Sequence, residues 1–245
     1  MPSLHEVARG VAGGARCCVI LVETEQLSDT LRSLGHLLRA DEADRARQYA
    51  RKVDRDQFVV GRAVVRQIGA LSLGAPPTSI ELVNGAYGKP HYRDTPIEFN
   101  VSHTRGLVGV GFGMSPIGID VERIGETQDI VGIASRFFTS REVAVLTASA
   151  PDAAERTFYR AWTAKEAVLK ASGAGLSADL GNVEFDLTQE EPTMVGLAAP
   201  LGDPDDWYLM ALPLQPPYMG SLAIAGRRLE VSVLRYQVSD LVMTS

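Results

Sequence analysis

The chain has 245 residues, of which 45% are hydrophobic and 22% charged, and its formal net charge is -6 at pH 7. This balance is that of a globular protein and excludes disordered, collagen-like and coiled-coil classes. The acidic charge argues against broad nucleic-acid binding, which needs a basic face. The longest apolar run near the N-terminus, Cys17 to Val22, is too short to span a bilayer, and no signal layout precedes it. We therefore expect a cytoplasmic protein without a membrane segment.

The first part of the chain predicts one strand, then helices, then several strands. Arg16 to Glu23 has the composition of a buried strand, and leucines from Leu27 to Leu38 recur at helical spacing. A longer helical pattern runs from Asp41 to about Leu73, where Gly74-Ala-Pro-Pro ends it. The strands expected after it lie at residues 80–83, 97–102, 107–114 and 117–121, with a loop at residues 84–96.

The second part repeats this order. A helix is expected from Ser140, a longer one from about Pro151 to Ala171, and then strands. Arg55-Asp-Gln-Phe and Glu155-Arg-Thr-Phe open helices of similar length, which indicates a duplication with a period of about one hundred residues. We therefore predict an α+β fold of two similar halves, residues 1–115 and 116–245. The last three expected strands, at residues 207–212, 220–225 and 229–236, would complete the second sheet.

The residues that could hold a metal ion are carboxylates. Cys17 and Cys18 are neighbours on one expected strand, so they point to opposite faces and are expected to be small buried side chains. The four histidines are scattered and lack the spacing of a zinc site. Asp120 and Glu122 lie two apart on an expected strand and so share a face. Either these like charges lie in open solvent, or a hard cation such as Mg²⁺ neutralises them.

A third carboxylate lies on the second long helix, where Trp162, Glu166 and Lys170 form one stripe. In isolation, Glu166 and Lys170 are most simply a surface ion pair of little energetic value. Together with the strand carboxylates, they suit a metal-assisted site that binds phosphate.

Further upstream, several residues are of phosphate-binding types. Lys89 lies in a loop, and Ser102 and His103 end a strand, although a lone histidine there is also a common structural hydrogen bonder. The stretch from Arg45 to Arg66 is locally basic and is either a solvated helix face or a site for phosphate or an acidic partner. The glycines at residues 106–113 lack the order of a dinucleotide-binding loop.

The two main motifs, Ile117-Gly-Ile-Asp120 and Trp162-Thr-Ala-Lys-Glu-Ala-Val-Leu-Lys170, resemble the signatures of the 4'-phosphopantetheinyl transferases. Gly88-Lys-Pro90, Asn100-Val-Ser-His103 and the segment from Arg136 to Glu142 extend the resemblance in the same order. The length resembles the larger, monomeric Sfp type. The resemblance implies two halves forming a pseudo-dimer with a pseudo-twofold axis and the active site between them.

Such enzymes move the phosphopantetheine arm of coenzyme A to a serine of an apo acyl or peptidyl carrier protein and release 3',5'-ADP. By resemblance, Asp120, Glu122 and Glu166 would hold Mg²⁺, or alternatively Mn²⁺. Glu166 would be the base for the serine, and Lys170 would neutralise the departing phosphate. Lys165 is expected to be a phosphate or structural contact.

The resemblance also assigns contacts for coenzyme A. Gln57 stands where many relatives carry an arginine, so Arg55 or Arg62 is expected to contact the 3'-phosphate in its place. The other contacts with the nucleotide end are expected at Lys89, Pro90, Ser102 and His103.

Two alternative functions remain open from the residues. One is a metal-dependent phosphoesterase or nuclease that uses the same carboxylates, although the chain lacks the basic face expected of a nuclease. The other is a non-catalytic relative that binds only the carrier protein or coenzyme A. Intact Asp120, Glu122, Glu166 and Lys170 argue against that loss of function.

Overall fold

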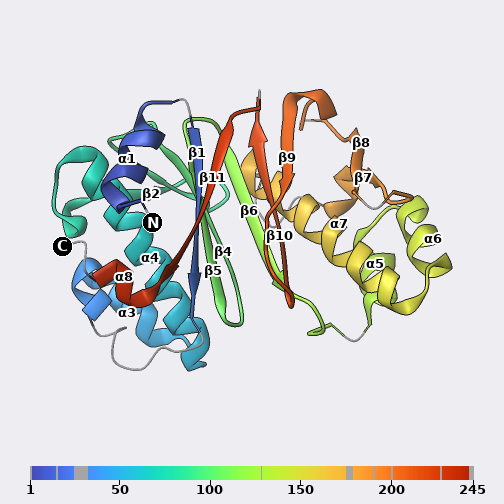
Figure 1. The fold of residues 1–245 in the computed structure, drawn as a ribbon, viewed down its shortest axis with the longest axis horizontal. Helices are drawn as coiled ribbons and strands as arrows, with labels where there is room; N and C mark the ends of the chain where they lie inside the picture. The colour runs from blue at the N-terminus through green and yellow to red at the C-terminus, as the bar shows by residue number, and fades with distance from the viewer. Residues whose placement is uncertain are drawn as a thin grey trace. The chain divides into compact units, whose positions relative to one another are not determined.

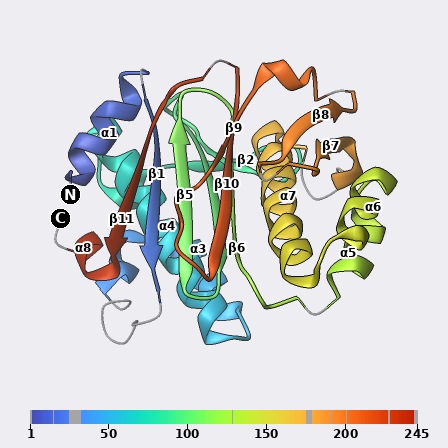
Figure 2. The same ribbon diagram turned by 45° about the vertical axis from the view of Figure 1, so that its right-hand side comes forward.

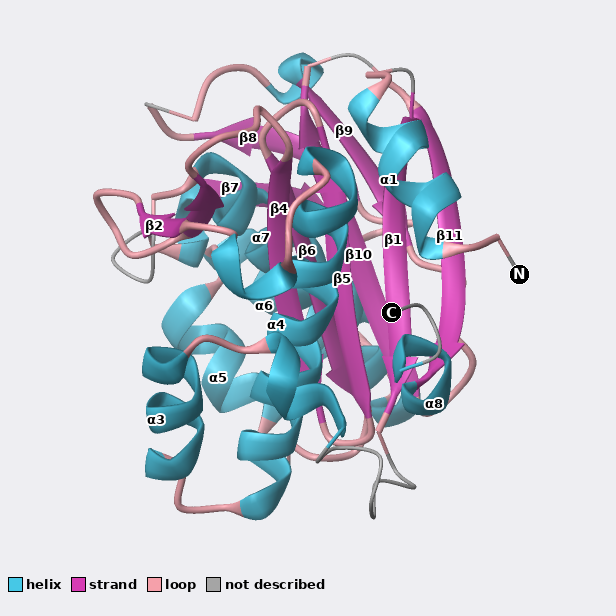
Figure 3. Cartoon of the chain, turned by 90° about the vertical axis from the view of Figure 1, so that its left-hand side faces the viewer, coloured by secondary structure: helices cyan, strands magenta, loops and turns pink. Residues whose placement is uncertain are grey.

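The computed structural model describes residues 2–14, 16–24, 33–127, 129–174, 179–189, 191–199, 201–226 and 228–242. The chain divides into two compact units. The first comprises residues 1–85, 90–115 and 229–245, and the second comprises residues 86–89 and 116–228. One boundary of this division lies between residues 115 and 116, and residues 229–245 belong to the first unit. Helices and strands follow one another mostly in separate runs along the chain, as expected for the α+β class (Figure 3).

The first unit is built on a four-stranded sheet in the order β11-β1-β5-β4. β1 pairs with β5 in antiparallel and with β11 in parallel orientation, and red β11 lies beside blue β1 in Figure 1. β2 and β3 form a separate hairpin. The elements are α1 (Leu4–Ala12), β1 (Arg16–Glu23), α3 (Ala40–Gln48), α4 (Lys52–Leu73), β2 (Leu82–Asn84), β3 (Pro90–Tyr92), β4 (Glu98–Thr104), β5 (Leu107–Gly113), β11 (Glu230–Gln237) and α8 (Val238–Val242).

The second unit is built on a three-stranded antiparallel sheet in the order β6-β10-β9, against which α7 packs. α5 and α6 lie beside α7, in yellow and green in Figure 2. β7 and β8 form a hairpin. The elements are β6 (Ile117–Arg123), α5 (Ile130–Phe137), α6 (Ser140–Ala148), α7 (Pro151–Ser172), β7 (Val183–Asp186), β8 (Thr193–Leu197), β9 (Trp207–Ala211) and β10 (Tyr218–Ala225).

Two sequence expectations about the elements are wrong. The helix expected from Asp41 to Leu73 is interrupted, because Tyr49 and Arg51 have extended backbone angles between α3 and α4. The strand expected at residues 229–236 exists as β11 but completes the first sheet, where it pairs with β1. The sequence also did not indicate α5 or the strands β3 and β8, and most of the helix expected from Leu27 to Leu38 lies outside the described residues.

The order of elements within the first unit recurs within the second. In each unit a short helix precedes a helix of 22 residues, and that long helix ends at a glycine in the left-handed conformation, Gly74 at φ 63° or Gly173 at φ 71°. A 3-10 turn and a hairpin follow, and then two antiparallel strands of which the second pairs with the first strand of the unit. This recurrence supports the duplication, while the pseudo-twofold arrangement of the halves stays a prediction.

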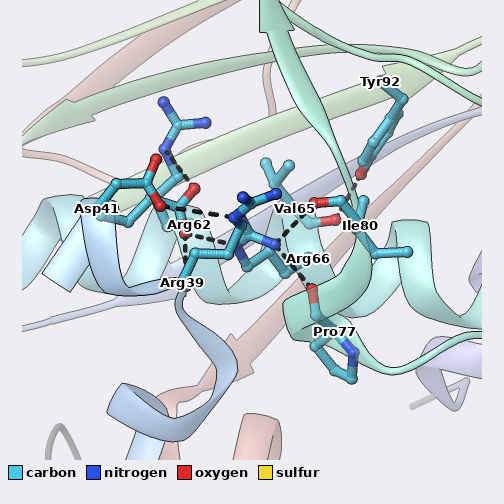
Figure 4. A network of polar contacts seen from close by, with 9 residues as sticks. Arg39, Asp41, Arg62, Val65, Arg66, Pro77, Ile80 and Tyr92 are labelled. Carbon is cyan, nitrogen blue, oxygen red and sulfur yellow. Dashed lines mark hydrogen bonds and ion pairs between the residues drawn. The ribbon is translucent and has the colours of Figure 1, made fainter.

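A buried cation ties each long helix to the chain that follows it. In the first unit, Arg66 is 1% exposed, forms an ion pair with Glu42, and donates to the carbonyls of Pro77 and Ile80 at 2.8 and 3.0 Å (Figure 4). Tyr92 donates to the carbonyl of Val65 on the same helix. Because buried charges require partners, this network fixes α3, α4 and the turn before β2 together.

Candidate active site

The strand β6 presents two carboxylates on the face that α7 covers. Its apolar residues Ile117, Ile119 and Val121 are fully buried, and they alternate with Gly118, Asp120 and Glu122 as the pleat requires. Asp120 is 3% exposed and Glu122 is partly exposed. The strand therefore holds both carboxylates on one face, as the sequence predicted.

Gly118 allows α7 to approach this strand closely. A Cβ atom at this position would lie 2.0 Å from the carbonyl oxygen of Ala167 and 2.4 Å from the backbone nitrogen of Ala171. Only glycine accommodates a helix backbone at that distance. The contact places the turn of α7 that ends in Lys170 directly over β6.

Lys170 and Asp120 form the central ion pair of this site, with the ammonium nitrogen 2.5 Å from Asp120 Oδ1. Burial by itself would lower the pKa of Lys170, but the attraction of Asp120 and the hydrogen bond to it prevail and raise that pKa. The lysine is therefore charged at neutral pH and is held beside the carboxylates.

The two other carboxylates hold protons more tightly than usual. Burial, followed by repulsion from Asp120, raises the pKa of Glu122 to about 7. Burial is also the main cause of the raised pKa of Glu166, to which Asp120 contributes. The three carboxylates are thus close enough to repel one another.

This donor set has the chemistry that a hard divalent cation requires. The side chains are not gathered around one point, however, and among the described residues no group of three or more His, Cys, Asp or Glu side chains is positioned to hold a metal ion. Instead, Lys170 neutralises Asp120. The carboxylate types and their mutual repulsion fit Mg²⁺. In this structure, the charge of Asp120 is neutralised by its ion pair with Lys170.

Lys165 does not belong to this site. It has no exposed surface, and its ammonium group donates to Glu142 at 2.8 Å and to the carbonyls of Leu180 and Val183. The expected contact with coenzyme A therefore does not fit the geometry, whereas the structural contact does. The reason is that Lys165 points to a different face of α7 from the stripe of Glu166 and Lys170.

Lys89, one of the upstream candidates, lies beside β6 within the second unit. Its ammonium group is 2.9 Å from the carbonyl of Ile117 and 3.3 Å from that of Ala171. It thereby joins the start of β6 to the last turn of α7, where a positive charge is favourable. Pro90 follows as the first residue of β3.

Ser102 and His103 lie on β4, on opposite faces of the strand. Ser102 is buried and His103 exposed. His103 lies near the start of α4, where its charge, after the hydrogen bond and charge of Arg51, helps to lower the pKa of Asp54. Gln57 is buried and donates to the carbonyl of Thr104, so it joins α4 to β4.

The basic stretch of α3 and α4 is largely paired with its own carboxylates. Arg55 lies 3.3 Å from Asp56 with its side chain 43% exposed, whereas Arg62 lies 3.7 Å from Glu42 and is 16% exposed. Of the two cations expected to replace an arginine at Gln57, Arg55 therefore has the more accessible side chain.

Sequence reasoning did not assign the contacts of two groups. Glu142, the partner of Lys165, is fully buried; the sequence marked it as the end of a segment that extends the family resemblance and by its capping box with Thr139, but gave it no partner. On β10, the strand next to β6, Ser221 lies opposite Asp120 and its hydroxyl is 2.9 Å from that of Thr163. No local pattern signals that contact.

Comparison with known proteins identifies the family. A family model described as 4'-phosphopantetheinyl transferase superfamily matches residues 116–215, and one described as 4'-phosphopantetheinyl transferase, N-terminal, matches residues 25–111. The 4'-phosphopantetheinyl transferase HetI of Nostoc sp. is 31% identical over 84% of this chain and 86% of its own. The chain belongs to the 4'-phosphopantetheinyl transferase superfamily. The resemblance predicted from the motifs is thereby confirmed.

Another member of the superfamily, the 4'-phosphopantetheinyl transferase Sfp of Bacillus subtilis, is 31% identical over 64% of this chain and 70% of its own. Among solved structures, the holo-[acyl-carrier-protein] synthase of Thermotoga maritima matches 46% of this chain and 64% of its own, at 21% identity and a TM-score of 0.36. In the part of this transferase that the structure describes, no helix is long and apolar enough to cross a membrane.

Proposed function

We propose that this transferase moves the 4'-phosphopantetheine arm of coenzyme A to a serine of an apo acyl or peptidyl carrier protein. The serine oxygen forms a bond to the phosphorus that carries the pantetheine arm. The bond from that phosphorus to the bridging oxygen breaks, and 3',5'-ADP leaves with the electron pair. The observation that carries this proposal is the juxtaposition of Asp120, Glu122 and Lys170 where α7 packs on β6.

Each residue of the site has a proposed role. The raised pKa of Glu166 makes its carboxylate a better base near neutral pH, and we assign to it the proton of the serine hydroxyl. Lys170, charged and held by Asp120, stabilises the negative charge of the departing phosphate.

Asp120, Glu122 and Glu166 are the proposed ligands of Mg²⁺, or of Mn²⁺, which accepts the same oxygen donors. When bound, the ion would neutralise charge on the pyrophosphate of coenzyme A and polarise its oxygens. Lys170, beside these ligands, would contact the phosphate as well.

Contacts with the nucleotide end of coenzyme A are proposed at Lys89, Pro90, Ser102 and His103. Arg55 is the preferred cation for the 3'-phosphate because its side chain is more exposed than that of Arg62. We further propose that the enzyme acts as a cytoplasmic monomer.

The test is intact mass spectrometry of apo carrier proteins incubated with the enzyme, coenzyme A and Mg²⁺, with EDTA as control. We expect a gain of about 340 Da, which is the phosphopantetheine arm added by phosphoryl transfer. Release of phosphate or free phosphopantetheine without a mass gain would favour a phosphoesterase. Binding of coenzyme A without any reaction would favour a non-catalytic relative.

A further inference from the structure

Glu166, the proposed base, is placed by the helix that carries it. In the part of the chain that the structure describes, no hydrogen bond or ion pair holds its carboxylate, because Lys170 pairs with Asp120 instead. The Glu166 side chain is partly exposed on α7. Its position therefore depends on the backbone of α7, and a contact that fixes the rotation of this helix also fixes the carboxylate.

The same side of α7 makes a second polar contact with the sheet. Thr163 lies three residues before Glu166 and seven before Lys170, so the three side chains form one stripe. The hydroxyl of Thr163 is 2.9 Å from that of Ser221 on β10, and these residues are 1% and 5% exposed. Because Thr163 donates its proton to the carbonyl of Arg160 at 3.2 Å, Ser221 is the donor between the two hydroxyls. The contact is thus directional and shielded from water.

The two polar contacts of this stripe end on directly paired residues of the sheet. In the antiparallel register of β6 and β10, Ser221 lies opposite Asp120. Directly paired residues project from the same face of a sheet with their Cβ atoms about 5 Å apart. Thr163 reaches Ser221, and Lys170 reaches Asp120. Along α7, Glu166 therefore lies between the two contacts.

We propose that Thr163 and Ser221 are positioning residues that hold Glu166 at the reacting serine. The inference rests on the proposed function, because it takes Glu166 as the base. The close packing at Gly118 sets the distance between α7 and β6, whereas the hydroxyl contact sets the rotation of α7 about its axis. A base aligned in this way before the substrate arrives needs no rearrangement during the reaction.

Removing the hydroxyls one at a time tests this assignment. Thr163→Val replaces the hydroxyl by a methyl group of similar shape, and Ser221→Ala deletes the donor. The double variant removes both partners, a change that is close to neutral for stability, so it keeps the test valid if a single variant folds poorly. Thr163→Ser retains the hydroxyl and is the rescue variant. Thr147→Val is the matched control, because exposed Thr147 donates to the carbonyl of Val143 within α6.

Steady-state transfer to a carrier protein gives kcat and KM, and thermal melting checks folding. We expect Thr163→Val and Ser221→Ala each to lower kcat about tenfold with an unchanged KM for coenzyme A, since a displacement of about 1 Å costs up to about 100-fold in rate. The double variant should lose no more than either single variant, because all three lack the same contact. Thr163→Ser and Thr147→Val should retain most of the wild-type kcat.

Crystal structures of the wild type and Thr163→Val give the position of Glu166 relative to Asp120, which we expect to differ between them. The inference would be overturned by an unmoved Glu166, by an unchanged kcat in the folded variants, or by additive losses in the double variant. A raised KM with normal kcat would also overturn it and would make Thr163 a substrate contact. Failure of the wild type to modify any carrier would instead count against the proposed function, because the displacement of Glu166 is measured without transfer.

Discussion

The ammonium group of Lys165 lies 2.8 Å from the carboxylate of Glu142, and neither side chain has any exposed surface. The same relation joins Arg66 to Glu42 in the first unit. In both units the carboxylate belongs to the third residue of a short helix and caps its start, and the cation also donates to carbonyls before or at the start of a hairpin. The two networks are independent structural evidence for the duplication.

Replacing Lys165 by methionine is expected to destabilise the protein by about 3–5 kcal/mol, because the charge of Glu142 would remain buried without its partner. Urea denaturation of the variant measures this loss. Arg47→Ala is the control, since Arg47 pairs with Asp44 on the exposed surface and should matter little. If the folded Lys165→Met protein instead kept its stability and lost affinity for coenzyme A, Lys165 would be a ligand contact after all.

Gly118→Ala should destabilise the second unit by at least about 3 kcal/mol, the upper end for overpacked sites, because the new methyl group would overlap the backbone of α7. Gly10→Ala provides the comparison: Gly10 lies in α1 with open space around its Cα, so alanine there should stabilise by about 0.5–1 kcal/mol. Measured by thermal melting, the melting temperature of Gly118→Ala should fall and that of Gly10→Ala should rise relative to the wild type. A Gly118→Ala protein with an unchanged melting temperature would contradict the close packing of α7 on β6.

Lys170→Met should lower kcat by about 100-fold or more, the typical effect of removing one preorganised donor to a developing oxyanion. The charge-conserving Lys170→Arg should retain more of the rate. Lys52→Met serves as control, because Lys52 is also paired with an aspartate but lies on the first unit's helix α4. Steady-state transfer to a carrier protein gives kcat, and a Lys170→Met enzyme with more than a tenth of the wild-type value would refute the role.

Glu166→Gln should abolish transfer while leaving the fold intact, since the amide cannot accept the serine proton. Glu230→Gln, an exposed carboxylate paired with Arg16, should retain wild-type turnover. The readout is again the mass gain of the carrier, and circular dichroism checks the fold. Substantial turnover by the Glu166→Gln enzyme would show that another group accepts the serine proton.

Stability should fall as the pH rises above about 9, because two thiols are buried in β1. Burial raises the pKa of Cys17 to about 11 and that of Cys18 to about 12, so both stay neutral in the folded state. Unfolding exposes them, and each loses its proton near pH 8.5. Above that value the unfolded state binds fewer protons, and each thiol costs about 1.4 kcal/mol of unfolding free energy per pH unit until its folded pKa is reached. Urea denaturation at pH 7 to 10.5 should show a shallower decline for the Cys17→Ala, Cys18→Ala double variant, and parallel declines would disprove this explanation.

Much of the candidate site could be predicted because it depends on local periodicity. Asp120 and Glu122 share a face through strand alternation, and Glu166 and Lys170 share a stripe through helical spacing. Lys165 was misassigned in part because its environment depends on Glu142, which is distant in sequence. The contact of Ser221 with Thr163 also escaped prediction, since it depends on strand register.

The fold was predictable to a similar degree. The strand at Arg16–Glu23 and the helix beginning at Pro151 are confirmed, because their patterns are long and regular. The alternation of residues 229–236 correctly indicated a strand, but a strand pattern does not specify its partner. Its actual neighbour is the distant β1, and only the three-dimensional structure gives that pairing.

That pairing has a consequence for synthesis of the chain. Arg16 and Glu230, which face each other on β1 and β11, are 214 positions apart. During translation β1 leaves the ribosome early, while most of the second unit emerges and can fold before β11 arrives. Until then the apolar strand β1 has an uncovered edge, a hazard for aggregation. Any stalling or truncation before residue 230 would therefore damage the half of the molecule made first.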